Sequence, residues 1–219
     1  MAIRTLFFDL DGTLADTEPD ILFCLKETFQ ENKILWDESK IRIGKPLSEM
    51  LKIAYPNLTD SDIQKIIVEF RALYNVSSYP ETKLYDGMFE TLSELRRRSI
   101  TLFVATNKVM LPTRRLLEKF QIASFFDEVL TPDCFAGETL RKCETMSRTL
   151  EKYKLLPEES ALIGDHTDDI HAARAAGIRS IAATWGYDAK ECLAVARPDV
   201  FVQSPKMILH CVGEGNGDE

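Results

Sequence analysis

The chain has 219 residues, 45% of them hydrophobic and 28% charged, which is the balance of a soluble globular protein. Its formal charge of −8 argues against nucleic acid or an anionic membrane as a partner. No apolar run reaches the roughly 20 residues that span a bilayer, and the N-terminal segment lacks the pattern of a signal peptide.

The length suits one large domain or a core with a smaller insert. The five cysteines are odd in number and scattered, which predicts free thiols in a reducing cytoplasm. They are Cys24, Cys134, Cys143, Cys192 and Cys211.

The first notable stretch places two acids at the end of a short apolar run. Residues 6–8 are typical of a strand buried on both faces, and Asp9 and Asp11 follow directly. Gly12 then allows a sharp turn. Two carboxylates this close repel each other unless a cation or a proton lies with them, so the stretch predicts such a site. The alternative is an ordinary turn beside a chance acid.

The next segment, from about residue 16 to residue 80, shows helical periodicity and no strand signal. A helix is expected from Pro19, a loop over residues 41–47 and a brief helix before Pro56. Thr59 or Asp60 is expected to cap a longer helix. This segment therefore predicts a small helical bundle inserted after the first strand.

From residue 81 to residue 212, strands and helices alternate, which implies a doubly wound, mainly parallel α/β sheet of the Rossmann-like type. With residues 1–15 this segment would form the core. The predicted strands cover residues 100–105, 126–130, 161–164, 180–183 and 200–202. The predicted helices cover residues 88–98, 112–120, 143–153 and 167–176. Residues 213–219 are glycine-rich and acidic and are expected to be disordered.

Polar residues stand where three of these strands end. Asp9, Thr106 and Asp165 each follow a different predicted strand. The carboxyl ends of parallel strands gather at one edge of a sheet, where ligands bind. The sequence therefore predicts that distant residues share one crevice.

The string Asp-Leu-Asp-Gly-Thr-Leu, starting at Asp9, resembles the first motif of the haloacid dehalogenase superfamily of phosphotransferases. The resemblance implies that Asp9 is a nucleophile and Asp11 a general acid/base. The dehalogenase branch lacks the second acid, so Asp11 indicates phosphoryl transfer. The segment from residue 16 to residue 80 resembles the helical cap of the same superfamily.

Three further motifs resemble the family. Thr106-Asn107 resembles the second motif, and Lys142 resembles the third. The resemblance implies that these residues, together with Gly12, hold phosphoryl oxygens. It also implies that Lys142 is catalytic. Cys143 stands where proline is common and is expected to be a buried, inert thiol; a redox switch next to Lys142 is the alternative. The run from Gly164 to Asp169 resembles the fourth motif.

The fourth motif implies a metal site. Asp165 would bind the metal directly, and Asp169 would act through a metal-bound water or a hydrogen bond to Lys142. Asp168 is the alternative second acid. Mg²⁺ is the expected cofactor, because it prefers hard oxygen ligands such as the Asp9 carboxylate and the Asp11 backbone carbonyl. His166 lacks a second histidine at a suitable spacing and is not expected to be a ligand.

The runs 85–87 and 172–177 resemble phosphoglycolate phosphatase-like members. The resemblance implies a magnesium-dependent phosphatase for a small phosphorylated metabolite, with a cap that closes over the cleft. Lys45, a cation in a glycine-containing cap loop, is a candidate to reach the substrate. A β-phosphoglucomutase-like phosphotransferase and a pyrophosphatase are the alternatives on this fold. A receiver domain and a non-catalytic binding protein are disfavoured by the insert and the intact acids. The sequence does not predict the oligomeric state.

Overall fold

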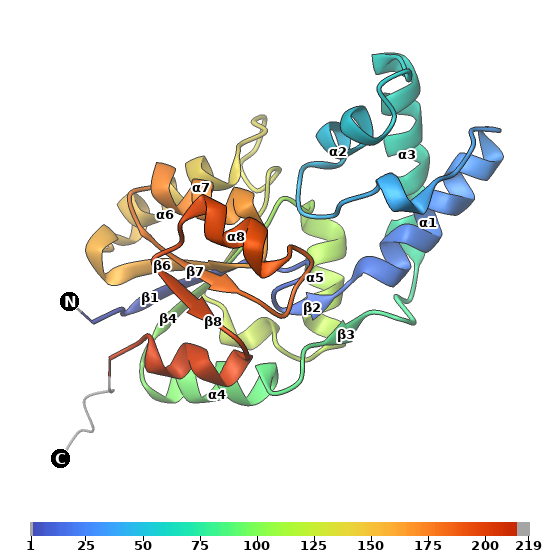
Figure 1. Ribbon diagram of the computed structural model, residues 1–219. Helices are drawn as coiled ribbons and strands as arrows, with labels where there is room; N and C mark the ends of the chain where they lie inside the picture. The colour runs from blue at the N-terminus through green and yellow to red at the C-terminus, as the bar shows by residue number, and fades with distance from the viewer. Residues whose placement is uncertain (1, 214–219) are drawn as a thin grey trace.

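The computed structural model describes residues 2–213 and has a sheet core with a helical segment beside it (Figure 1). The predicted disordered tail, apart from Gly213, lies outside the described residues. The core is a six-stranded parallel sheet in the order β5-β4-β1-β6-β7-β8, which confirms the predicted fold class. Its strands are β1 Thr5–Phe8, β4 Thr101–Ala105, β5 Glu128–Leu130, β6 Ser160–Gly164, β7 Arg179–Ala183 and β8 Val200–Val202.

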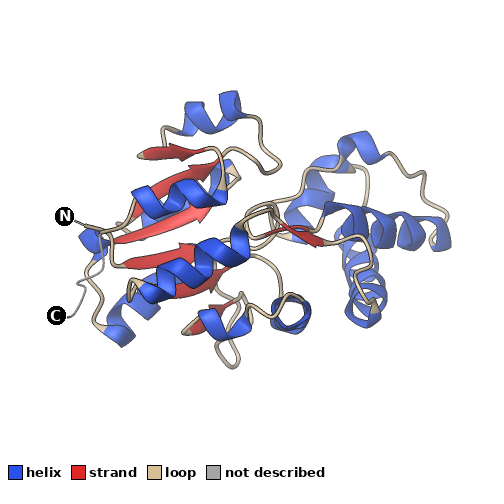
Figure 2. Cartoon of the chain, turned by 90° about the horizontal axis from the view of Figure 1, so that it is seen from below, coloured by secondary structure: helices blue, strands red, loops and turns tan. Residues whose placement is uncertain are grey.

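Helices cover both faces of this sheet (Figure 2). Successive side chains of a strand point to opposite faces, so Leu6 and Phe8 pack with residues of α4 and α5, while Phe7 packs with residues of α6 and α7. The core helices are α4 Met88–Arg97, α5 Met110–Lys119, α6 Lys142–Tyr153, α7 Thr167–Ala175 and α8 Lys190–Ala196. Short 3₁₀ helices cover Glu38–Lys40, Ala123–Phe125, Pro157–Glu159 and Pro205–His210.

The helical segment contains α1 Glu18–Glu31, α2 Leu47–Ala54 and α3 Asp60–Val76, and we call it the cap. Thr59 is the N-cap of α3. Of the two residues expected to cap this helix, Thr59 and Asp60, it is the first. Its hydroxyl accepts from the Asp62 amide at 3.2 Å, and its own amide donates to the Asp62 carboxylate at 3.0 Å. This reciprocal capping box satisfies two amides that the helix leaves free.

A two-stranded antiparallel ribbon joins the cap to the core. It pairs β2 Ala15–Asp16 with β3 Lys83–Leu84. β2 ends at Asp16, the approximate start of the segment in which the sequence shows no strand signal. Two paired residues are too short to show an alternating pattern, which is why the sequence gives no sign of them. The predicted domain limits stay a prediction.

Buried polar contacts tie the two cap linkers together. Asp20, in the first turn of α1, is 3% exposed and accepts from the Thr82 amide at 2.7 Å and the Thr82 hydroxyl at 2.6 Å. Arg115 and Lys119 of α5 donate to the backbone carbonyls of Asn75 and Tyr79, near the C-terminus of α3. Cations at this end of a helix are favourable. The cap is thus held at both of its linkers.

Among residues 2–213, no helix combines the length and the apolar character that crossing a membrane requires.

Candidate active site

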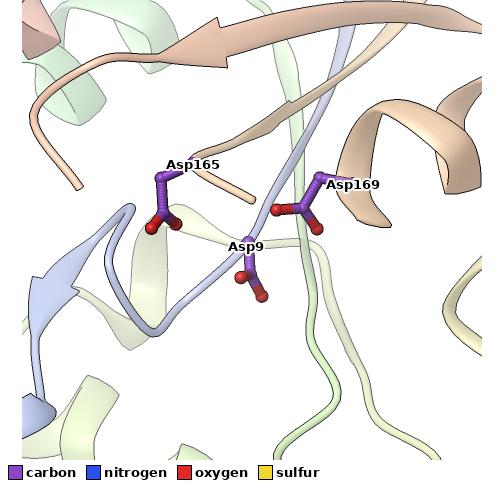
Figure 3. A group of neighbouring side chains, drawn as sticks. All are labelled: Asp9, Asp165 and Asp169. Carbon is purple, nitrogen blue, oxygen red and sulfur yellow. The ribbon is translucent and has the colours of Figure 1, made fainter. Parts of the chain in front are cut away.

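Three carboxylates meet at the carboxyl edge of the sheet (Figure 3). Asp9 follows β1, Asp165 follows the neighbouring strand β6, and Asp169 lies in the first turn of α7. One oxygen of each lies within 4.8 Å of the others, and all three residues are buried. The parallel topology therefore brings together acids that are more than 150 positions apart in the chain.

Lys142, the first residue of α6, supplies a positive charge to this cluster. Its Nζ lies 2.9 Å from Asp9 Oδ1 and 2.5 Å from Asp169 Oδ1, so the predicted contact with Asp169 is present. Burial alone would lower the pKa of Lys142, but the charges of Asp169 and Asp9 outweigh burial and raise it. Lys142 is therefore a cation at neutral pH.

One lysine does not neutralise three buried acids. Burial raises the pKa of Asp9 to about 7, although the charge of Lys142 acts in the opposite direction. Burial and the charges of Asp9 and Asp169 also raise the pKa of Asp165 well above its usual value. Ionisation of the whole cluster therefore requires a further positive charge.

The donor atoms fit a divalent cation such as Mg²⁺. Asp9 Oδ1 is buried, and its close contact among the described residues is the ion pair with Lys142 Nζ at 2.9 Å. Asp165 is oriented by the Thr13 hydroxyl at 2.7 Å and by the Tyr187 amide at 2.8 Å. Carboxylate oxygens held in this way are hard donors of the kind that Mg²⁺ prefers.

Gly12 allows the first loop to pass directly against Asp165. Its φ of 81° lies in the left-handed region, and a Cβ at this position would stand 2.1 Å from Asp165 Oδ2. Both the backbone angle and the lack of space require glycine. The sharp turn expected after Asp11 is present.

Asp11 stands apart from the three-carboxylate cluster. Its Oδ1 accepts from the Thr17 hydroxyl at 2.6 Å and from Lys108 Nζ at 2.9 Å. The Lys108 ammonium also lies 4.7 Å from the centre of the Tyr74 ring, on α3 of the cap. Sequence reasoning missed Lys108, although its position directly after Thr106-Asn107 was a usable signal.

Thr106 and Asn107 line the same cavity as Asp9 and Asp11. The Thr106 hydroxyl accepts from the Lys108 amide at 3.2 Å. The Asn107 side chain donates to the Gly44 carbonyl of the cap at 3.0 Å, so it reaches the cap loop instead of the carboxylates.

The cap loop around Lys45 contacts the start of α7. Lys45 Nζ lies 2.8 Å from Asp168 and 3.2 Å from Glu49. Asp168 therefore lies outside the carboxylate cluster, and Asp169 is the acid of the fourth motif that joins Asp165 there. His166 caps α7, because its Nδ1 accepts from the Asp168 amide at 3.1 Å. A Cβ on Gly44 would stand 2.5 Å from the His166 ring, so the loop approaches the ring closely.

All five cysteines are free thiols, as expected. Cys143, which was expected to be buried, is only half-buried. It follows Lys142 on α6, where the lysine turns inward and the next residue faces partly outward.

A cavity of about 500 Å³ lies between the acids and the cap. Its core side includes Asp9, Asp11 and Thr106, and its cap side includes residues of α2 and α3. This volume is in the range of small-molecule sites. The fold places these lining residues around one cavity. The roles that the sequence assigns to them stay predictions.

The model of the haloacid dehalogenase-like hydrolase family matches residues 6–183. A phosphoglycolate phosphatase of Vibrio vulnificus (strain CMCP6) is 31% identical over 221 residues, covering 96% of this chain and 96% of its own. A pyrophosphatase, PpaX, of Oceanobacillus iheyensis is 27% identical and covers 98% of this chain and 99% of its own. A solved haloacid dehalogenase-like hydrolase from Streptococcus pneumoniae superposes with a TM-score of 0.85 at 27% identity, covering 95% and 97%. The chain therefore belongs to the haloacid dehalogenase-like hydrolase family, as an enzyme of the phosphatase type that resembles the phosphoglycolate phosphatases.

Proposed function

We propose that the protein is a magnesium-dependent phosphatase that hydrolyses a small phosphomonoester, similar to phosphoglycolate, through an aspartyl-phosphate. The supporting observation is the cluster of Asp9, Asp165 and Asp169, with oxygens within 4.8 Å of one another and Lys142 against two of them. The similarity to a phosphoglycolate phosphatase over nearly the whole chain supports the substrate class.

In this proposal Asp9 attacks phosphorus in line and becomes phosphorylated while the leaving oxygen departs. Asp11 protonates that oxygen and later takes a proton from the water that attacks the aspartyl-phosphate. Its contacts with Thr17 and Lys108 support this role, because they fix the carboxyl group at the side of the cavity.

Mg²⁺ would be held by Asp9, Asp165, Asp169 and the backbone carbonyl of Asp11. When bound, it supplies the positive charge that lets Asp9 approach an anionic phosphoryl group. Lys142 neutralises developing negative charge, and Thr106, Asn107 and the Gly12 amide bind phosphoryl oxygens. Asn107 would exchange its contact with Gly44 for one with the substrate. The five free thiols support a reducing, cytoplasmic location.

The test is phosphate release from phosphoglycolate, alkyl phosphates and pyrophosphate, with and without Mg²⁺. We expect Asp9→Asn to lower kcat by a factor of about 10⁴ or more, because the amide cannot form the phosphoenzyme. Glu151→Gln, an equivalent change at an exposed position of α6, is the control and should keep the parent's rate. An Asp9→Asn protein that turns over at the parent's rate contradicts the proposal.

The same panel separates the alternatives. A mutase would release little phosphate without a bisphosphate activator. A pyrophosphatase, the activity in the name of one relative, would prefer pyrophosphate to every ester in the panel.

A further inference from the structure

One face of α3 forms part of the cavity wall opposite the acids. Gln64, Ile67, Arg71 and Tyr74 follow one another at spacings of three, four and three residues, and all four line the cavity. This spacing places them on one side of the helix. Ile67 and Tyr74 are buried, whereas Arg71 is exposed. The face therefore presents a guanidinium group next to an apolar and aromatic surface.

Two polar groups on this face lack partners. The Tyr74 hydroxyl and Asn75 Oδ1 are buried and form no hydrogen bond within the described part of the chain. Tyr74 is only 2% exposed. Burial, reinforced by the negative charge of Asp11, raises the pKa of Tyr74, so the phenol is neutral and can donate. Buried polar groups usually have a partner, which makes these two candidates for contact with a bound molecule.

The charges in the cavity distinguish Arg71 from the other cations in its wall. Lys45 contacts Asp168 and Glu49, and Lys108 contacts Asp11. Arg71 forms no ion pair with any carboxylate of residues 2–213 within 4.0 Å. Its charge is therefore available to a ligand.

The position of Arg71 relates it to the leaving group. Arg71 lies one helical turn before Tyr74, and the Tyr74 ring lies against the Lys108 ammonium that contacts Asp11. In the proposed reaction Asp11 faces the leaving oxygen. The α3 face is therefore reached by the part of the substrate that extends beyond this oxygen.

We propose that Arg71 and the Tyr74 hydroxyl bind a second anionic group, a carboxylate or a phosphate, carried on the leaving group. This inference rests on the proposed phosphatase function, because that function assigns Asp11 to the leaving oxygen. A guanidinium group binds either anion through paired N–H donors, and the phenol adds one further donor. Arg71 is thus a specificity residue that favours doubly anionic substrates over simple alkyl phosphates.

The test compares substrates of similar length that differ in charge: phosphoglycolate, ethyl phosphate with its neutral leaving group, and pyrophosphate. We expect Arg71→Met to lower kcat/KM for phosphoglycolate by about 10- to 100-fold, mainly through KM, because a charge-assisted contact is lost. The change for ethyl phosphate should be less than about twofold. Comparing the losses for phosphoglycolate and pyrophosphate shows which anion the site prefers.

Two further variants separate a specific contact from a general charge effect. Arg71→Lys keeps the charge without the paired donors and should retain part of the preference. Lys65→Met, a loss of charge on the same helix at a residue that pairs with Glu69 and does not line the cavity, should leave all three substrates unaffected. Tyr74→Phe should reduce the preference for phosphoglycolate severalfold.

Equal losses for phosphoglycolate and ethyl phosphate, or no loss for either anion-bearing substrate, would overturn the inference while leaving the phosphatase proposal intact. If the parent hydrolyses none of the three, the phosphatase proposal fails. Calorimetric titration of phosphoglycolate and ethyl phosphate into Asp9→Asn, with and without Arg71→Met, then decides the inference. A weaker Kd for phosphoglycolate alone supports it, and an unchanged Kd or no binding contradicts it.

Discussion

Lys108 is the residue that most changes the interpretation of the site. It contacts both oxygens of Asp11, at 2.9 and 3.1 Å, and only 8% of its side chain is exposed. An acid/base group must keep a fixed direction toward the leaving oxygen to transfer a proton efficiently. We therefore assign Lys108 the task of positioning Asp11.

This assignment predicts that Lys108→Met lowers kcat for alkyl phosphates by roughly 10- to 100-fold, because in the proposed reaction Asp11 protonates the poor leaving group. The loss for p-nitrophenyl phosphate, whose leaving group needs no proton, should be small. Steady-state kinetics with both substrates provides the measurement, and Lys108→Arg is the conservative control. Similar losses for the two esters would point to a structural role of Lys108.

For single residues, the sequence predicts the positions of the polar side chains that directly follow a strand. Asp9, Thr106 and Asp165 lie where the parallel sheet requires, because each directly follows a buried apolar run. Lys108, Tyr187 and Arg71 were not assigned roles. Their contacts depend on how loops and cap helices pack across the cavity, and no local pattern encodes that packing.

Among the elements, the loop between α1 and α2 makes polar contacts with α7 and with the loop that follows β4. Lys45 contacts Asp168, and the Gly44 carbonyl accepts from Asn107. Both partners of the ion pair are about 30% exposed, with relative areas of 28% and 32%, so the pair alone contributes only about 0–1 kcal/mol. Its importance would lie in holding the loop over the cavity.

We expect Lys45→Ala to raise KM severalfold, because Lys45 lines the cavity and is the cap residue expected to reach the substrate. Asp168→Asn, which removes the ion pair but keeps Lys45, should raise KM less. Kinetics of the two single variants and the double variant separate the two contributions. Identical effects of both substitutions would confine Lys45 to holding the loop, and an unchanged KM in Lys45→Ala would remove it from substrate binding.

Element types are predictable where the periodic pattern is long. The 17-residue α3 has a capping residue and one apolar face, and the sequence predicts both. The two-residue strands β2 and β3 and the seven-residue α8 were missed, because so few residues cannot establish a period. The ribbon matters despite its size, because it connects the cap to the core.

For the whole molecule, the buried acids link stability to pH and to metal. The folded-state pKa of Asp9 is raised to about 7 and that of Asp165 is also raised, so the metal-free folded protein holds protons that the unfolded chain releases at lower pH. The protonated carboxyl groups of Asp9 and Asp165 therefore contribute fully to the free energy of unfolding below about pH 4. This contribution is lost as the pH rises through about 7.

Accordingly, Asp165→Asn should raise the Tm of the metal-free protein at pH 8 and raise it less at pH 5. Mg²⁺ should raise the Tm of the parent at pH 8 by an amount that grows with the Mg²⁺ concentration, because it binds the folded state. The variant should respond weakly. Thermal unfolding with EDTA or Mg²⁺ at both pH values provides the measurement. A pH-independent difference between the two proteins would contradict this account of the cluster.

The central position of β1 has a consequence for biosynthesis. This strand is made first, yet it pairs on one side with β4, near residue 101, and on the other with β6, near residue 160. During synthesis from the N-terminal side, the residues up to about 163 must therefore be delivered before the strand that leads to Asp9 is enclosed. Until then the apolar run from Leu6 to Phe8 has an open edge, which is the stage at which a nascent chain of this topology is most exposed to misassociation.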